Sequence, residues 1–322
     1  MNPFSDLEDQ QVQFLGERRL IAKISEWIKN STPTSPHGIG DDAAIINIQD
    51  GHLIVTKDSL VYQKHFDDAA DAQLVGEKLL KRNLSDLAAM GAKPDSAVIA
   101  CLLPPSTSVH WLRDFYHGLE TCASEFEVKI LGGDITSTFS DLAFTLTLFG
   151  RGSKKSLTRK SSTPGDTLWV TGSLGGSILG KHLTFTPRLK EGAWLAQHPS
   201  VTSGMDLSDG LATDLKHLCP EDCFVELNTD EVPISKAAST LAASTDKQPI
   251  QHALTDGEDY ELLFTVKGEI PPKQFAQEWN AAFSTRVTRI GKIMTRQSDN
   301  TPTIQNKGSY SGSDEQGYEH FR

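Results

Sequence analysis

The first half of the chain alternates short runs of β-branched residues with longer segments in which apolar residues recur every three or four positions. The β-branched and alternating runs predict strands at 43–48, 52–56, 96–103, 128–134 and 141–150. Helical periodicity predicts helices at 16–30, 71–92 and 108–126. In the second of these helices Leu80, Leu84 and Leu87 share one face, and Gly91 and Pro94 end it. Strands and helices in this order are typical of a mixed α/β fold.

A polar, basic and turn-rich stretch, RGSKKSLTRKSSTPGD at 151–166, interrupts this pattern and predicts a domain boundary. After it the alternation resumes, with strands expected at 167–172, 261–266 and 288–293 and helices at 176–183 and 208–218. We therefore expect an α/β (α+β) chain of two mixed domains, 1–150 and 151–322. Each would have a sheet covered by helices, with the functional site between them or on the N-terminal sheet.

Composition narrows the class of protein. The 322 residues carry a net charge of −11, which argues against binding to nucleic acid or to anionic lipid. The longest apolar run, AVIACLL at 97–103, is too short to span a membrane, and the first residues lack the pattern of a signal peptide. Four scattered cysteines do not make a disulfide framework. We therefore expect reduced thiols and a cytoplasmic location.

Two stretches imitate nucleotide-binding motifs. GIGDDA at 38–43 has the spacing of a dinucleotide-binding turn, but a strand follows it instead of preceding it. GGSILGKH at 175–182 differs from the phosphate-binding loop motif at one position, because His182 stands where a serine or threonine would hold the metal. Because 176–183 is expected to be a continuous helix, Lys181 would lie more than one turn inside it. We therefore favour close helix packing as the role of these small residues.

Seven aspartates lie at element ends or on a buried face: Asp41, Asp42, Asp58, Asp86, Asp134, Asp206 and Asp209. Each alone has an ordinary explanation as a turn former or a cap, and Ser208 could cap the helix that Asp209 enters. Asp86 is harder to explain in this way because its helix face is mostly apolar. Oxygen ligands without histidine or cysteine suit hard cations such as Mg²⁺. The aspartates therefore predict a site that binds metals and, through them, phosphates.

Several motifs together resemble the thiamine-monophosphate kinase family: GIGDDAAI, NLSDLAAMGAKP, LGGD, VTGSLGGS, DLSDGLATDL and DGEDYELLF. They follow the family's order along nearly the whole chain. The wider superfamily includes aminoimidazole ribotide synthetase, selenophosphate synthetase and a hydrogenase maturation factor. GEDYEL favours the thiamine enzyme, and no cysteine precedes Cys101, whereas selenophosphate synthetase would want one near the N-terminus. The resemblance implies phosphorylation of thiamine monophosphate by ATP, with Mg²⁺, in a homodimer formed through the N-terminal domain.

The resemblance also implies roles for individual residues. Metal-binding positions are matched by Asp42, Thr56, Asp58, Asp86, Asp134, Asp206 and Asp209, with Asp41 beside them. ATP contacts are matched by Tyr116, Gly133, Asp134, Arg159 and Ser208. Contacts to the thiamine phosphate are matched by His65, Glu258 and Tyr318. We expect Asp42, Asp86, Asp134 and Arg159 to act in catalysis. Taken alone, Arg159 would be a solvated charge in a basic linker and Tyr116 a core residue of its helix.

Charge shapes the expected mechanism, because two unit charges of like sign 4 Å apart repel by about 4 kcal/mol at an effective dielectric of 20. Clustered Mg²⁺ offsets this repulsion, and the acceptor phosphate is already ionised at pH 7, so no general base is needed. Another ATP-dependent enzyme of the superfamily and a non-catalytic cation-binding protein stay open as alternatives. Lys57 stands where the family commonly has threonine, and its side chain points either toward the metals or into solvent.

Overall fold

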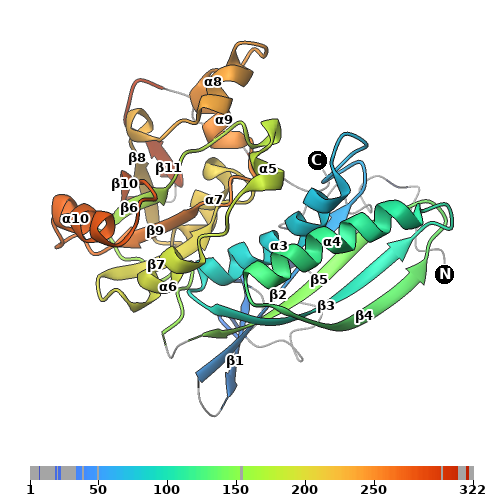
Figure 1. Cartoon of the computed structure of the whole chain (residues 1–322). Coiled ribbons are helices and arrows are strands. Elements are labelled where there is room, and N and C mark those ends of the chain that lie inside the picture. Colours follow the sequence, from blue (N-terminus) through green and yellow to red (C-terminus); the bar gives the residue numbers. More distant parts are fainter. Residues whose placement is uncertain are drawn as a thin grey trace.

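The computed structural model describes residues 7, 19, 21–22, 34–37, 40–48, 51–152, 155–298, 300–310 and 317–318. Two mixed sheets, each packed against helices, confirm the expected α/β class (Figure 1). The predicted helix at 16–30 lies outside the described residues except for Arg19, Ile21 and Ala22. Within the described ranges no helix is long and apolar enough to cross a membrane.

Among the described residues, five strands form the first sheet in the order β1-β2-β5-β3-β4. They are β1 Ala44–Ile48, β2 Gly51–Val61, β3 Lys93–Leu103, β4 Lys129–Ser137 and β5 Ala143–Gly152. Strands β3 and β4 are parallel, and helix α4 (Val109–Glu125) connects them. Helix α3 (Ala72–Ala89) lies beside α4 on the same face of the sheet (Figure 1). Because β2 and β4 extend further than predicted, Asp58 lies within a strand and not after it, and Asp134 lies inside a strand and not at its end.

Helices α3 and α4 pack closely because each presents a glycine to the other. A Cβ atom at Gly76 would lie 2.0 Å from the carbonyl oxygen of Phe115, and one at Gly118 would lie 1.9 Å from that of Gln73. Below the helices, Phe115 stacks on Phe144 of β5 with ring centroids 4.1 Å apart. This core holds α3 above the sheet, so the side chains of α3 that face the site are held in place.

Six described strands form the second sheet in the order β11-β8-β10-β6-β9-β7. They are β6 Thr167–Thr171, β7 Val201–Asp206, β8 Cys223–Leu227, β9 Leu262–Val266, β10 Val287–Thr295 and β11 Ile304–Asn306. The helices around it are α5 Lys181–Thr184, α6 Leu189–Gln197, α7 Leu211–Leu218, α8 Lys236–Ala242, α9 Pro249–Thr255 and α10 Pro272–Ala282. Helices α7 and α9 pack on one face of this sheet, and α6 and α10 pack on the other.

The C-terminal end of α3 joins the two sheets. Ala88 and Ala89 belong to the apolar core that α6 and α10 form with the second sheet. A Cβ atom at Gly192 of α6 would lie 1.9 Å from the carbonyl oxygen of Ala88, so the two helices touch along their backbones. The strands of the first sheet lie within 44–152 and those of the second within 167–306. The division into domains 1–150 and 151–322 stays a prediction.

Two predicted helix boundaries were wrong. The stretch 176–183 is a short 3-10 turn, η2 (Ser177–Leu179), followed by α5, because Gly180 has φ 132° and breaks the helix between them. Helix α7 begins at Leu211, and the residue before it, Gly210, has a φ of 101°. The N-cap position is thus a glycine, and no side chain caps this helix. Ser208 therefore does not cap the helix, and Asp209 lies in the turn before it.

Candidate active site

Three carboxylates from separate elements meet where the two sheets join. Asp42 lies just before β1, Asp86 lies on α3 and Asp206 ends β7, and one oxygen of each lies within 4.8 Å of the others. Ser85 Oγ donates a hydrogen bond to Asp206 at 2.6 Å, and the Thr56 hydroxyl donates one to Asp86. A set of ligands made of oxygen alone is the kind that Mg²⁺ prefers.

The carboxylates of this cluster oppose one another's ionisation. The pKa of Asp206 is raised to about 8, chiefly by burial and next by the charge of Asp42. Burial also raises the pKa of Asp86 well above its ordinary value, and Asp58, Asp206 and Asp42 add to the effect. A divalent cation among these oxygens would turn mutual repulsion into attraction. The residues therefore fit a metal ion.

Next to this cluster is a cavity of about 490 Å³ that both halves of the chain line. The predicted site residues in its lining are Asp58, His65, Asp86, Asp206, Ser208, Asp209, Glu258 and Tyr318. Lys64, Arg82, Ile178, Asp256 and Tyr260 also line it. The volume is within the usual range for a small-molecule site. Residues predicted to bind metal, nucleotide and thiamine phosphate thus meet in one place.

Arg159 is tied to the carboxylate cluster and is not a solvated linker residue. Its Nε and one terminal nitrogen donate to the two oxygens of Asp42, both at 3.0 Å. Its backbone N–H donates to Asp41 Oδ1 at 2.7 Å, and Ser35 also donates to Asp41. Burial lowers the pKa of Arg159, but Asp42 and other acids raise it by more, so the guanidinium stays charged. Asp41 thus connects the segment before β1 to Ser35 and Arg159, and it lies outside the cluster of three carboxylates.

Arg82 is a site residue that the sequence analysis missed. It lies one turn before Asp86 on α3, with one guanidinium nitrogen 3.2 Å from Asp58 Oδ1 and another donating to the Ser59 carbonyl at 2.9 Å. Its Nε is buried and has no hydrogen-bond partner within the described part of the chain. An arginine that lines the cavity with an unused donor is well suited to a phosphate oxygen. The sequence does contain a signal for Arg82: it precedes Asp86 by four residues, which places both side chains on the same face of the helix.

Lys78 connects helix α3 to the segment that carries Glu258. The Lys78 side chain is fully buried, and its Nζ lies 2.9 Å from Glu258 Oε1 and donates to the His65 carbonyl at 3.0 Å. Glu258 and Tyr260 have φ values of 52° and 50°, in the left-handed region that residues other than glycine rarely adopt. Phe185 stacks on Tyr260 with centroids 3.9 Å apart. Ion pairing and stacking together hold Glu258 at the cavity in this uncommon conformation.

Tyr116, Gly133 and Asp134 lie apart from the cavity. Asp134 and Gly133 are on the edge strand β4, which β3 and β5 separate from β2, a distance of about 14 Å across the sheet. The Tyr116 hydroxyl lies 3.2 Å from the sulfur of Cys101 on β3. A Cβ atom at Gly133 would lie 1.7 Å from the Ile99 carbonyl oxygen, which explains the glycine. Within one chain, these three predicted ATP contacts form a separate group, and their roles stay predictions.

The Lys57 side chain does not point toward the carboxylates. Residues of a strand alternate between the faces of its sheet, and Thr56 is buried under the helices whereas Lys57 is exposed. The inward orientation considered for Lys57 is therefore wrong.

Comparisons with known proteins agree with this geometry. The family model of the AIR synthase related protein, N-terminal domain, matches residues 40–152. The chain is 35% identical to the thiamine-monophosphate kinase of Rhodopirellula baltica, in a match that covers 80% of this chain and 84% of the relative. It is 34% identical to the thiamine-monophosphate kinase of Escherichia coli K12, with 78% and 82% covered. Among solved structures it resembles AaThiL complexed with AMPPCP and TMP, with a TM-score of 0.82, 25% identity, and 98% and 100% of the two chains covered.

Proposed function

Since this chain belongs to the thiamine-monophosphate kinase family, we propose that it transfers the γ-phosphate of ATP to thiamine monophosphate, which gives thiamine diphosphate and ADP. The observation that carries this proposal is the cavity in which buried carboxylates, Arg82 and the thiamine-phosphate positions meet. The cavity thus combines carboxylates that would hold Mg²⁺ with a positively charged guanidinium, and both serve to bind the phosphates of the two substrates.

In this reaction a phosphate oxygen of thiamine monophosphate attacks the γ-phosphorus. The bond from that phosphorus to the bridging oxygen breaks, and the electron pair of the bond leaves with ADP. The second pKa of a phosphomonoester is about 6, so the attacking oxygen carries no proton at pH 7. His65 fits this scheme, because its Nδ1 accepts a hydrogen bond from the Val61 N–H at 3.0 Å. The neutral ring therefore carries its proton on Nε2 and acts as a donor instead of a base.

The residues that would hold Mg²⁺ are Asp42, Asp86 and Asp206, with Thr56, Asp58 and Asp209 as further positions beside them. Bound there, Mg²⁺ supplies positive charge for the phosphates of both substrates. Arg82 offers its Nε to a phosphate oxygen and keeps Asp58 in place. Arg159 orients Asp42 through two parallel hydrogen bonds. Glu258, His65 and Tyr318 form the side of the cavity that takes thiamine monophosphate.

The proposal includes a homodimer formed through the first sheet and a cytoplasmic location. Helices α3 and α4 cover one face of this sheet, and the described residues place no helix on the other face (Figure 1). Leu131 and Ile135 on the edge strand β4 are 64% and 69% exposed, which is typical of an interaction surface. A second copy packed against the first sheet at β4 would bury the Leu131 and Ile135 side chains. It would also bring its own Asp134 toward the dimer axis.

The direct test is incubation of the protein with ATP, Mg²⁺ and thiamine monophosphate, followed by chromatography. We expect thiamine diphosphate and ADP to form in equal amounts. ADP formation without thiamine diphosphate would favour another ATP-dependent enzyme of the superfamily. Mg²⁺ binding with no turnover of ATP would favour a cation-binding protein.

A further inference from the structure

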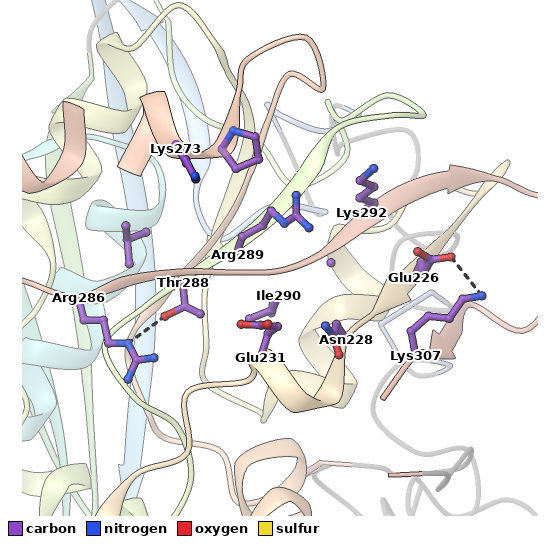
Figure 2. Close-up of a pocket in the computed structure, with 13 residues that line it drawn as sticks. Glu226, Asn228, Glu231, Lys273, Arg286, Thr288, Arg289, Ile290, Lys292 and Lys307 are labelled. Atoms are coloured by element: carbon purple, nitrogen blue, oxygen red, sulfur yellow. Dashed lines mark hydrogen bonds and ion pairs between the residues drawn. The ribbon is translucent and has the colours of Figure 1, made fainter. Parts of the chain in front are cut away.

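A second cavity lies at strand β10, outside the active site (Figure 2). Its volume is about 720 Å³, and residues of β10, of the segment after β8 and of the start of α10 line it. Its cationic residues are Lys273, Arg286, Arg289, Lys292 and Lys307, and its acidic residues are Glu226 and Glu231. The lining thus carries five positive and two negative side chains, a balance of +3 in a chain of net charge −11. Such a concentration of positive charge attracts anions locally.

A β-bulge places two of these cations on one side of β10. Residues three apart in a regular strand point to opposite faces. The pairing of β10 with β6 shifts between Arg289 and Gly291, and as a result Arg289 and Lys292 are both exposed while Ile290 and Ile293 are both fully buried. Bulges of this kind commonly re-aim side chains at functional sites.

Among the described residues, Lys307 is the only one of these five cations with an acidic partner, and Arg286 donates to the Thr288 hydroxyl. Lys307 pairs with Glu226 at 3.5 Å, but in the described part of the chain no carboxylate pairs with Lys273, Arg289 or Lys292. Figure 2 shows these three side chains on the same side of the β10 ribbon. Lys273 also lies in the first turn of α10, an 11-residue helix whose N-terminal end adds a partial positive charge. The charges around this groove are therefore available to a ligand.

We propose that this groove binds the polyphosphate group of an anion, either inorganic or part of a nucleotide, without a metal ion. Arginine and lysine contact phosphate oxygens directly, and the volume suits a small molecule. The active site differs in this respect, because its buried carboxylates repel phosphates unless cations lie between them. Binding in the presence of EDTA therefore distinguishes the groove from the active site.

The test is isothermal titration calorimetry of the full chain with inorganic tripolyphosphate in EDTA. We expect the unaltered protein to bind tripolyphosphate. In the double variant Arg289→Ala/Lys292→Ala the affinity should fall by a factor of roughly ten or more. The matched control is Lys190→Ala/Lys236→Ala, which removes the same charge from exposed positions outside the groove. We expect the control to bind as the unaltered protein does.

Absence of binding, equal affinity in the groove variant, or an equal loss in the control would each overturn the proposal. A parallel titration with ATP, which carries the same three phosphates, identifies the source of the ligand: equal affinity indicates recognition of the phosphates alone, and tighter binding indicates contacts to the nucleoside as well. Kinase activity of the groove variant should match that of the unaltered protein, because the groove shares no lining residue with the active site. Failure of this proposal would therefore leave the proposed function untouched.

Discussion

Lys78, fully buried on α3, forms an ion pair of 2.9 Å with Glu258, which lies just before β9 and lines the active-site cavity. Burial lowers the pKa of Lys78, and the charge of Glu258 offsets only part of that effect. The same lysine lowers the pKa of Glu258 although burial acts in the opposite direction. Each member of the pair therefore depends on the other to stay charged.

Replacing Lys78 should affect both stability and substrate binding. Lys78→Met leaves Glu258 without its partner, and we expect a loss of roughly 3 kcal/mol in the free energy of unfolding. The KM for thiamine monophosphate should rise more than the KM for ATP, because Glu258 is no longer held at the cavity. Urea denaturation and steady-state kinetics measure these effects, with the exposed Lys236→Met as control. An unchanged urea midpoint together with an unchanged KM would contradict this role of the pair.

Arg82→Lys keeps the positive charge but removes the planar fork that contacts both Asp58 and the Ser59 carbonyl. We expect kcat to fall by roughly tenfold to a hundredfold, and Arg82→Ala to lower it further. Thermal unfolding of the same variants separates loss of fold from loss of catalysis. A lysine variant with kcat within about twofold of the unaltered protein would remove Arg82 from the phosphate-binding groups.

Asp86→Asn should nearly abolish turnover while the protein stays folded. The substitution also removes one of three carboxylates that repel one another, so in EDTA the variant should unfold at a higher temperature than the unaltered protein. The stabilisation that Mg²⁺ gives should become smaller. Thermal unfolding with EDTA and with Mg²⁺ measures both effects. A lower unfolding temperature in EDTA would show that the carboxylates do not oppose one another.

Unphosphorylated thiamine should be a poor acceptor. Its hydroxyl is neutral and needs a base, whereas the His65 ring, with Nδ1 already engaged, offers a donor. We expect kcat/KM for thiamine to be roughly a hundredfold or more below that for thiamine monophosphate. Comparable values for the two acceptors would mean that a general base operates in the cavity.

Stability should decrease between about pH 4 and pH 7 because of Asp259. Burial raises the pKa of this carboxyl to about 7, although Lys181 and the Gly175 N–H oppose the shift. In the unfolded chain the same group has a pKa of about 3.9. The folded state therefore binds more protons than the unfolded state in this window, and the free energy of unfolding falls as the pH rises.

Asp259→Asn removes this titration. From pH 4 to pH 8 the variant should gain up to roughly 4 kcal/mol relative to the unaltered protein. Urea denaturation at each pH provides the comparison, and asparagine can still accept the hydrogen bond from Gly175. A constant difference between the two proteins across the range would refute the assignment to Asp259.

Apolar periodicity predicted the elements around the cavity well, but it did not predict their ends. Strand β2 continues past Thr56 because its backbone pairs with β5 as far as Val61, and the polar residues Lys57 to Ser59 hid this extension. The helix expected at 176–183 matched an apolar pattern, yet Gly180 adopts a backbone conformation that interrupts it. Pairing partners and positive φ angles are properties of the folded chain, so local patterns do not reveal them.

The candidate site shows the same division. Asp86 was recognisable because it stands on an apolar helix face, and the structure places it beside Asp42 and Asp206. Arg82 was not recognisable, because a single arginine on a helix is normally solvated. Only the folded chain reveals that its Nε is buried at the cavity with no hydrogen-bond partner among the described residues.

Helix α3 carries Lys78, Arg82 and Asp86 at intervals of four residues, and each interval advances about 6 Å along its axis. The group that fixes Glu258 and the carboxylate that faces the metal positions are therefore about 12 Å apart along one rigid element. A helix cannot lengthen without losing its backbone hydrogen bonds, so α3 keeps the spacing of these three side chains constant. The helix therefore fixes the distance between the Glu258 end of the cavity and the carboxylate cluster. The separation of these two groups is thus set by the backbone of one helix, and a change in either side chain would leave it unaltered.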